Sequence, residues 1–128
     1  MVKNSKKSSR TRVFVETAAF TRLVKHEQIS DDMLNELQND IINGIGDTIR
    51  NTLGLKKIRF ATKSGGKSGG WRAIYADYPQ YNITVLIFAF PKNVQENLTA
   101  EQTKELRKIK AITDKEMEKR YGKEKRKK

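Results

Sequence analysis

Cysteine is absent from this 128-residue chain, and histidine occurs once, as His26. Disulfides and thiolate metal sites are therefore excluded, and a single histidine makes no zinc site without several carboxylates. We expect neither a metal nor another cofactor. The chain also has no run of about 18 apolar residues, and no apolar stretch of secretory length follows its basic amino terminus. These absences predict a soluble, cytoplasmic protein without a membrane segment.

Acidic residues are few relative to basic ones, 15 against 27, which gives a formal net charge of +12. The charge is unevenly distributed. Residues 55–72, LKKIRFATKSGGKSGGWR, contain six basic residues and no acidic one, whereas residues 13–54 contain three basic and seven acidic residues. A concentrated basic surface favours nucleic acid through phosphate neutralisation and counterion release. The same positive surface could instead attract an anionic membrane or an acidic partner protein.

The length and the 36% content of hydrophobic residues fit one domain with one core, provided that the basic ends lie outside it. Residues 1–11 are too polar for burial of their side chains to offset the entropy cost of ordering them, and we expect them to form a disordered basic arm. We expect the domain to span residues 12–112. Residues 113–128 would then be a helical extension with a basic tail.

Helix starts are marked by capping residues. Thr17 and Ser30 are suitable N-caps for two successive helices, the second ending near Gly44. Thr99 and Gln102 form a capping-box pattern for a last helix. The residues of that helix expected to face inward are Leu106, Ile109 and Ile112.

Strands are expected at residues 12–16, from Leu55 onward, at 71–76 and at 83–90. In the strand after Leu55, Ile58 and Phe60 alternate with Lys57 and Arg59, so one face can be buried while the other shows two cations. The order is strand, two helices, three strands and a helix. It predicts an α+β domain with helices packed on a mainly antiparallel sheet.

Several residues have more than one interpretation. The alternating cations could form the solvated side of a sheet, or bind phosphate together with Arg72. Trp71 could stack on a base, although an aromatic residue on a strand is more often core. Phe88 and Phe90 are interpreted as core or lid. Gly66-Lys67-Ser68 is not a P-loop, because Ala61 occupies the place of its first glycine and a strand follows.

Three segments, in this order and spacing, resemble the RelE/HigB family of toxins from bacterial type II toxin–antitoxin systems. They are residues 54–59 (GLKKIR), residues 66–72 (GKSGGWR), and Lys92-Asn93 followed by Asn97-Leu98-Thr99. Asn93 and Leu98 stand where RelE itself has an arginine and a tyrosine, as is common in the HigB-like branch. The resemblance covers residues 12 to about 112. It implies a RelE-like fold, with a small curved sheet of order β-α-α-β-β-β-α and flanking helices.

The same resemblance implies an activity, a set of residues and partners. The activity is metal-independent cleavage of messenger RNA in the ribosomal A site, by attack of the ribose 2′-hydroxyl on the adjacent phosphodiester. The implied partners are the ribosome with its RNA and a cognate antitoxin of the HigA or RelB type, and the free toxin is expected to be monomeric. The implied catalytic residues are Lys57, Arg59, Arg72 and Lys92, and the expected RNA-binding residues are Lys56, Lys63, Lys67, Trp71 and Asn93.

Elementary chemistry is compatible with these roles. Arginine offers a planar fork for phosphate oxygens, and Arg59 and Arg72 could both use it. Neighbouring cations would lower the proton affinity of Lys57, which a general base requires. Two alternatives remain at this point. One is a non-catalytic binder of RNA or the ribosome, or a gyrase-targeting toxin of the ParE type; the other is a protein whose main partner is an acidic antitoxin segment.

Overall fold

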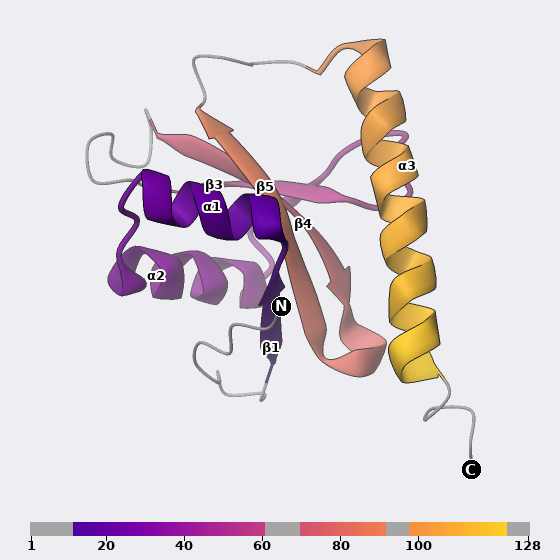
Figure 1. Ribbon diagram of the computed structural model, residues 1–128, viewed down its shortest axis with the longest axis horizontal. Helices are drawn as coiled ribbons and strands as arrows, with labels where there is room; N and C mark the ends of the chain where they lie inside the picture. Colours follow the sequence, from indigo (N-terminus) through magenta and orange to yellow (C-terminus); the bar gives the residue numbers. More distant parts are fainter. Residues whose placement is uncertain (1–11, 61–69, 92–97, 123–128) are drawn as a thin grey trace.

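The computed structural model describes residues 12–60, 70–91 and 98–122 (Figure 1). Lys63, Lys67, Lys92 and Asn93 lie outside the described residues. The elements are β1 (Val13–Glu16), α1 (Ala18–His26), α2 (Asp31–Ile42), β2 (Asp47–Thr48), β3 (Lys56–Phe60), β4 (Trp71–Tyr78), a 3-10 turn (Pro79–Tyr81), β5 (Ile83–Pro91), α3 (Ala100–Met117) and a π-helical turn (Glu118–Gly122).

The five strands form one sheet in the order β1-β5-β4-β3-β2. β2, β3, β4 and β5 pair antiparallel, whereas β1 at the edge pairs parallel with β5. The predicted α+β class with a mainly antiparallel sheet is confirmed. Two features differ from what was expected. The element order contains an additional two-residue strand, β2, and the sheet is open and uncurled where the resemblance implied a curved one (Figure 1).

Helices α1 and α2 cover one face of the sheet (Figure 1). Thr17 and Ser30 are their N-caps, as predicted, and accept hydrogen bonds from the backbone N–H groups of Phe20 and Met33. The apolar stripes of both helices pack on alternate residues of the strands. The largest side chains of this first core include Phe14, Phe20, Leu37, Phe60 and Tyr75.

Helix α3 packs on the opposite face, where it builds a second core with β4, β5 and the loop before β3. Its capping box is present as predicted. The Thr99 side chain accepts a hydrogen bond from the Gln102 backbone N–H, and the Gln102 side chain accepts one from the Thr99 backbone N–H. Leu106 and Met117 are buried from α3, and Ile109 is half-buried. The expectation that Ile112 faces inward is wrong, because 67% of it is exposed.

A polar cluster fixes the middle of α3 to the sheet. The Tyr78 hydroxyl donates to Asp114 at 2.6 Å, and the Lys110 ammonium pairs with the same carboxylate at 2.8 Å while lying 5.4 Å from the centre of the Tyr78 ring. Burial, and then the bond to Asp114, raise the pKa of the Tyr78 phenol above its ordinary value. Residues 113–117 thus belong to the packed helix, with Met117 in the second core and Tyr121 of the following turn packed against it.

Candidate active site

Three of the predicted catalytic side chains lie together on the α3-facing side of the sheet. Arg59 of β3 and Arg72 of β4 are direct cross-strand partners, and Lys57 is two residues before Arg59 on the same face. Side chains directly opposite in an antiparallel pair have Cβ atoms about 5 Å apart. We call Lys57, Arg59 and Arg72 the cation row.

The local sequence explains this placement. Ile58 and Phe60 are buried in the core under α1 and α2, so the residues that alternate with them must point to the other side. On β4, Ala73 and Tyr75 belong to the same core as Ile58, and Arg72 therefore points to the side of Arg59. The cation row is a consequence of the buried pattern on two paired strands.

The cations of the row are not paired with other side chains among the described residues. Within the part of the chain that the structure describes, no hydrogen bond or ion pair joins Lys57, Arg59 or Arg72 to another side chain. Arg59 is exposed and Arg72 is half-buried, and the Nη1 atom of Arg72 is buried with no hydrogen-bond partner. Like charges directly opposite in a sheet are destabilising, and a buried donor without an acceptor costs about 1–3 kcal/mol. An anion placed at the row would relieve both costs.

Carboxylates lie at the outer end of the row, which sequence reasoning had missed. Asp47 on β2 is the cross-strand partner of Lys57. Asp40 and Asp47 also line, with Lys57 and Arg59, a hollow of about 290 Å³ at the edge of β3. Lys57 is therefore flanked by groups of both signs. The signal for Asp47 is faint because a two-residue strand is too short to show an alternating pattern.

Two predicted RNA-binding residues lie on the other side of the sheet. Lys56 alternates with Lys57 and is the cross-strand partner of Tyr75, a residue of the core under α1 and α2. Trp71 is opposite Phe60 and packs against that core. Of its two interpretations, the core role is therefore the one that the packing of Trp71 favours. Neither residue shares a face with Arg72.

Aromatic residues continue the row toward α3. Phe90 on β5 is the cross-strand partner of Arg72, and Phe88 is that of Ile74. Both phenylalanines are half-buried, whereas Ile83 to Ile87 in the same strand are buried. Their interpretation as core or lid is thus incomplete, since both also line a hollow between β5 and α3.

A sequence model of one protein family, the RelE toxin of the RelE/RelB toxin–antitoxin system, matches residues 11–127. The chain belongs to this family. The match covers all of the described residues, including the whole of α3, and it agrees with the family suggested by the motifs of β3 and β4. RelE-family membership makes the chain a toxin of a toxin–antitoxin system.

Two further observations concern only the described residues. They contain no cluster of three or more histidine, cysteine, aspartate or glutamate side chains suited to a metal ion. None of the helices among them is long and apolar enough to cross a membrane.

Proposed function

We propose that this RelE-family toxin is a ribosome-dependent endoribonuclease of the HigB-like branch, which cuts messenger RNA in the A site and stops translation. The observation that carries the proposal is the Arg59–Arg72 pair: two arginines directly opposite each other on paired strands, with a buried Nη1 atom of Arg72 that lacks an acceptor. Two guanidinium forks on adjacent strands match the several oxygens of one phosphodiester.

The reaction needs no group beyond the RNA and the protein. The ribose 2′-oxygen passes its proton to the unprotonated amine of Lys57, which acts as general base, and bonds to the adjacent phosphorus, while the bond from phosphorus to the 5′-oxygen breaks. The products are a 2′,3′-cyclic phosphate and, once the leaving oxygen takes up a proton, a 5′-hydroxyl end. Arg59 and Arg72 stabilise the charge that builds on the phosphoryl oxygens.

Roles in proton transfer follow from position. Lys57 lies beside Arg59 at the end of the row, where it can approach the 2′-hydroxyl of a nucleotide whose phosphate is held by the two arginines. The resemblance adds Lys92 to the catalytic groups, and Lys63, Lys67 and Asn93 to the RNA contacts. The ribosome supplies in-line placement of the message, which explains how few protein groups suffice.

The test is primer extension on a defined message in a reconstituted translation system, with and without ribosomes. The wild-type protein is expected to cut only ribosome-bound message. Arg72→Ala is expected to reduce the cutting rate by roughly 10²–10³-fold, as the loss of a donor to a developing oxyanion does. Arg22→Ala is the matched control, because Arg22 is exposed on α1, across the sheet from the row.

Cutting by Arg72→Ala at the wild-type rate would contradict the proposal. A folded wild-type protein that leaves the message intact would point to a non-catalytic ribosome binder or to a gyrase poison, and supercoiling by purified gyrase separates these two. A cognate antitoxin of the HigA or RelB type, supplied in excess, is expected to abolish the cuts.

A further inference from the structure

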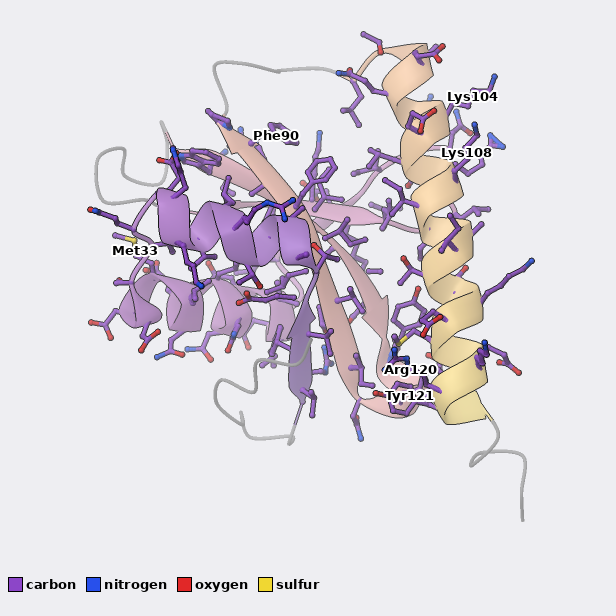
Figure 2. The ribbon with its side chains drawn as sticks, viewed as in Figure 1. Met33, Phe90, Lys104, Lys108, Arg120 and Tyr121 are labelled. Atoms are coloured by element: carbon purple, nitrogen blue, oxygen red, sulfur yellow. The ribbon has the colours of Figure 1, made fainter. Side chains whose placement is uncertain are left out.

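A hollow of about 310 Å³ lies between the end of β5 and the first half of α3, and we call it the β5–α3 hollow. Its apolar wall consists of Phe88 and Phe90 from the strand, Leu98, and Leu106 and Ile109 from the helix. Figure 2 shows Phe90 near the end of β5, while Lys104 and Lys108 point away from the sheet on the far side of α3. These two lysines thus face solvent and not the hollow.

The hollow is continuous with the cation row. Arg59, Arg72 and Phe90 are successive cross-strand neighbours on β3, β4 and β5, all on one face of the sheet. Each step between them is about 5 Å. A group held by the two arginines therefore has an aromatic surface directly beside it. In RNA, a base lies one ribose away from its phosphate.

The aromatic surface suits a flat ring. The rings of Phe88 and Phe90 are 6.2 Å apart and inclined by 55°, so they form a corner and not a closed stack. Both are half-buried, which leaves ring surface open to the hollow. Proteins that read unpaired RNA stack its bases on such side chains.

The rim of the hollow is acidic. Glu101 and Glu105, both exposed on α3, contribute to its lining, and Glu105 pairs with Lys108 at the long distance of 3.8 Å. Carboxylates repel a phosphate but accept hydrogen bonds from the amino and imino groups of a base. The hollow and the row therefore suit different parts of one nucleotide.

We propose that the β5–α3 hollow is a nucleobase pocket, which takes the base next to the phosphate held by Arg59 and Arg72. A base with N–H donors on its Watson–Crick edge fits the carboxylates best, and guanine presents two such groups side by side. This inference rests on the proposed function, because it assigns the hollow to the same RNA. It adds a source of sequence preference that the cation row, which contacts only phosphate, does not supply.

A binding experiment tests the pocket without requiring cleavage. Methyl and aromatic NMR signals of the isotope-labelled full chain are followed during titration with guanosine 3′-monophosphate, uridine 3′-monophosphate or inorganic phosphate. The guanosine nucleotide is expected to shift signals of Leu106 and Ile109 in the hollow, whereas inorganic phosphate shifts only signals next to Arg59 and Arg72, which include those of Phe90. Phe90→Ala is expected to weaken guanosine binding by roughly tenfold or more.

Two more variants sharpen the test. Phe90→Leu keeps an apolar side chain but removes the ring, and it replaces Phe90→Ala if that variant does not fold. Glu105→Gln is expected to reduce the preference for guanosine over uridine by roughly tenfold, and Ile112→Ala, on the exposed side of α3, is the control that leaves both affinities unchanged.

Equal shifts with all three probes, or guanosine binding that survives Phe90→Leu, would overturn the pocket. The cleavage map separates this failure from that of the proposed function. If the wild-type protein cuts RNA and Glu105→Gln cuts with the same base preference, the pocket proposal is wrong and the nuclease proposal stands. Guanosine binding at the hollow by a protein that makes no cuts would keep the pocket and remove the nuclease.

Discussion

At the scale of single residues, Arg72 combines three properties that are rarely found together. It is half-buried on a central strand, it lies directly opposite another arginine, and its Nη1 atom has no acceptor. Each of these properties costs stability in the free protein. Such costs are typical of residues at functional sites, which agrees with the phosphate-binding role proposed for Arg72.

Replacing Arg72 is therefore expected to stabilise the protein while removing its activity. In Arg72→Leu, the apolar side chain would adjoin Phe90 and remove both the charge repulsion with Arg59 and the unpaired nitrogen. We expect the free energy of unfolding to rise by about 0.5–1 kcal/mol in urea denaturation. Arg22→Leu, at an exposed position on α1, should stay within about 0.5 kcal/mol of the wild type. If the free energy of unfolding of Arg72→Leu instead fell by more than about 1 kcal/mol, Arg72 would be a residue that stabilises the fold.

Tyr75 provides a prediction about alkaline pH. Its side chain is buried with 1% exposure, and burial, followed by the charges of Asp77 and Asp47, raises the pKa of its phenol to about 12 from 10.0. Above pH 10 the unfolded chain releases this proton while the folded protein keeps it, so the stabilisation present below pH 10 is lost as the pH rises toward 12. The loss amounts to roughly 2–3 kcal/mol.

The measurement is urea denaturation of the wild type and of Tyr75→Phe at a series of pH values. The wild type should lose stability more steeply between pH 10 and 12 than the variant, which lacks the titrating group. Parallel curves for the two proteins would show that Tyr75 does not titrate differently in the folded and unfolded states.

Residue types at the site were predictable from sequence, but their adjacency was not. The alternation of Ile58 and Phe60 with Lys57 and Arg59 fixes which side chains share a face. It does not fix the register with β4, because the connection between Phe60 and Trp71 is too long for a turn type to set it. The pairing of Arg59 with Arg72, and that of Arg72 with Phe90, therefore needed the structure.

At the scale of elements, local sequence signals predicted the helix starts well, but they did not predict which strands pair over long sequence distances. Thr17, Ser30 and the Thr99–Gln102 box begin their helices as predicted, since capping acts within one turn. β2 was missed, and the parallel pairing of β1 with β5 joins residues about 70 positions apart, which no local pattern encodes.

The error at Ile112 has a geometric cause. Leu106, Ile109 and Ile112 are spaced by three residues, and each such step falls about 60° short of a full helical turn. After two steps the side chain has left the buried face. The spacing that does follow this face is set by Leu106, Lys110 and Met117, all buried. Because the middle residue of this buried stripe, Lys110, is charged, a pattern of apolar residues alone does not show the stripe.

Truncating Leu106 and truncating Ile112, both on α3, are expected to have different effects on stability. Leu106→Ala removes a side chain that is 3% exposed and leaves a cavity against β5, so it should cost about 2–5 kcal/mol in the free energy of unfolding. Ile112→Ala should change it by less than about 0.5 kcal/mol, because its side chain is mostly in solvent. Thermal or urea denaturation of both variants checks this. A comparable cost at Ile112 would mean that α3 packs in another rotation.

At the scale of the whole molecule, the fold separates charge across the sheet. Three acidic residues of α2, Asp31, Asp32 and Glu36, belong to the helical face opposite the cation row, whereas Asp40 lines the hollow at the edge of β3. The segment from 13 to 54 is net acidic in a chain of net charge +12. Most of the acidic residues of α2 would face away from an RNA surface that binds the row. Such a distribution orients a molecule during approach to a polyanion and speeds association.

Affinity for ribosomes should therefore fall steeply with salt, and the slope should depend on the cation row. Each phosphate contact contributes about one unit to the slope of log affinity against log salt concentration. Arg59→Ala, at an exposed position of the row, is expected to lower the slope by about one unit, and Arg22→Ala, on the helical face, to leave it unchanged. Sedimentation of the toxin with ribosomes at four or more salt concentrations measures both slopes. If Arg22→Ala lowered the slope as much as Arg59→Ala, net charge alone would govern binding, and the row would have no special part in meeting the RNA.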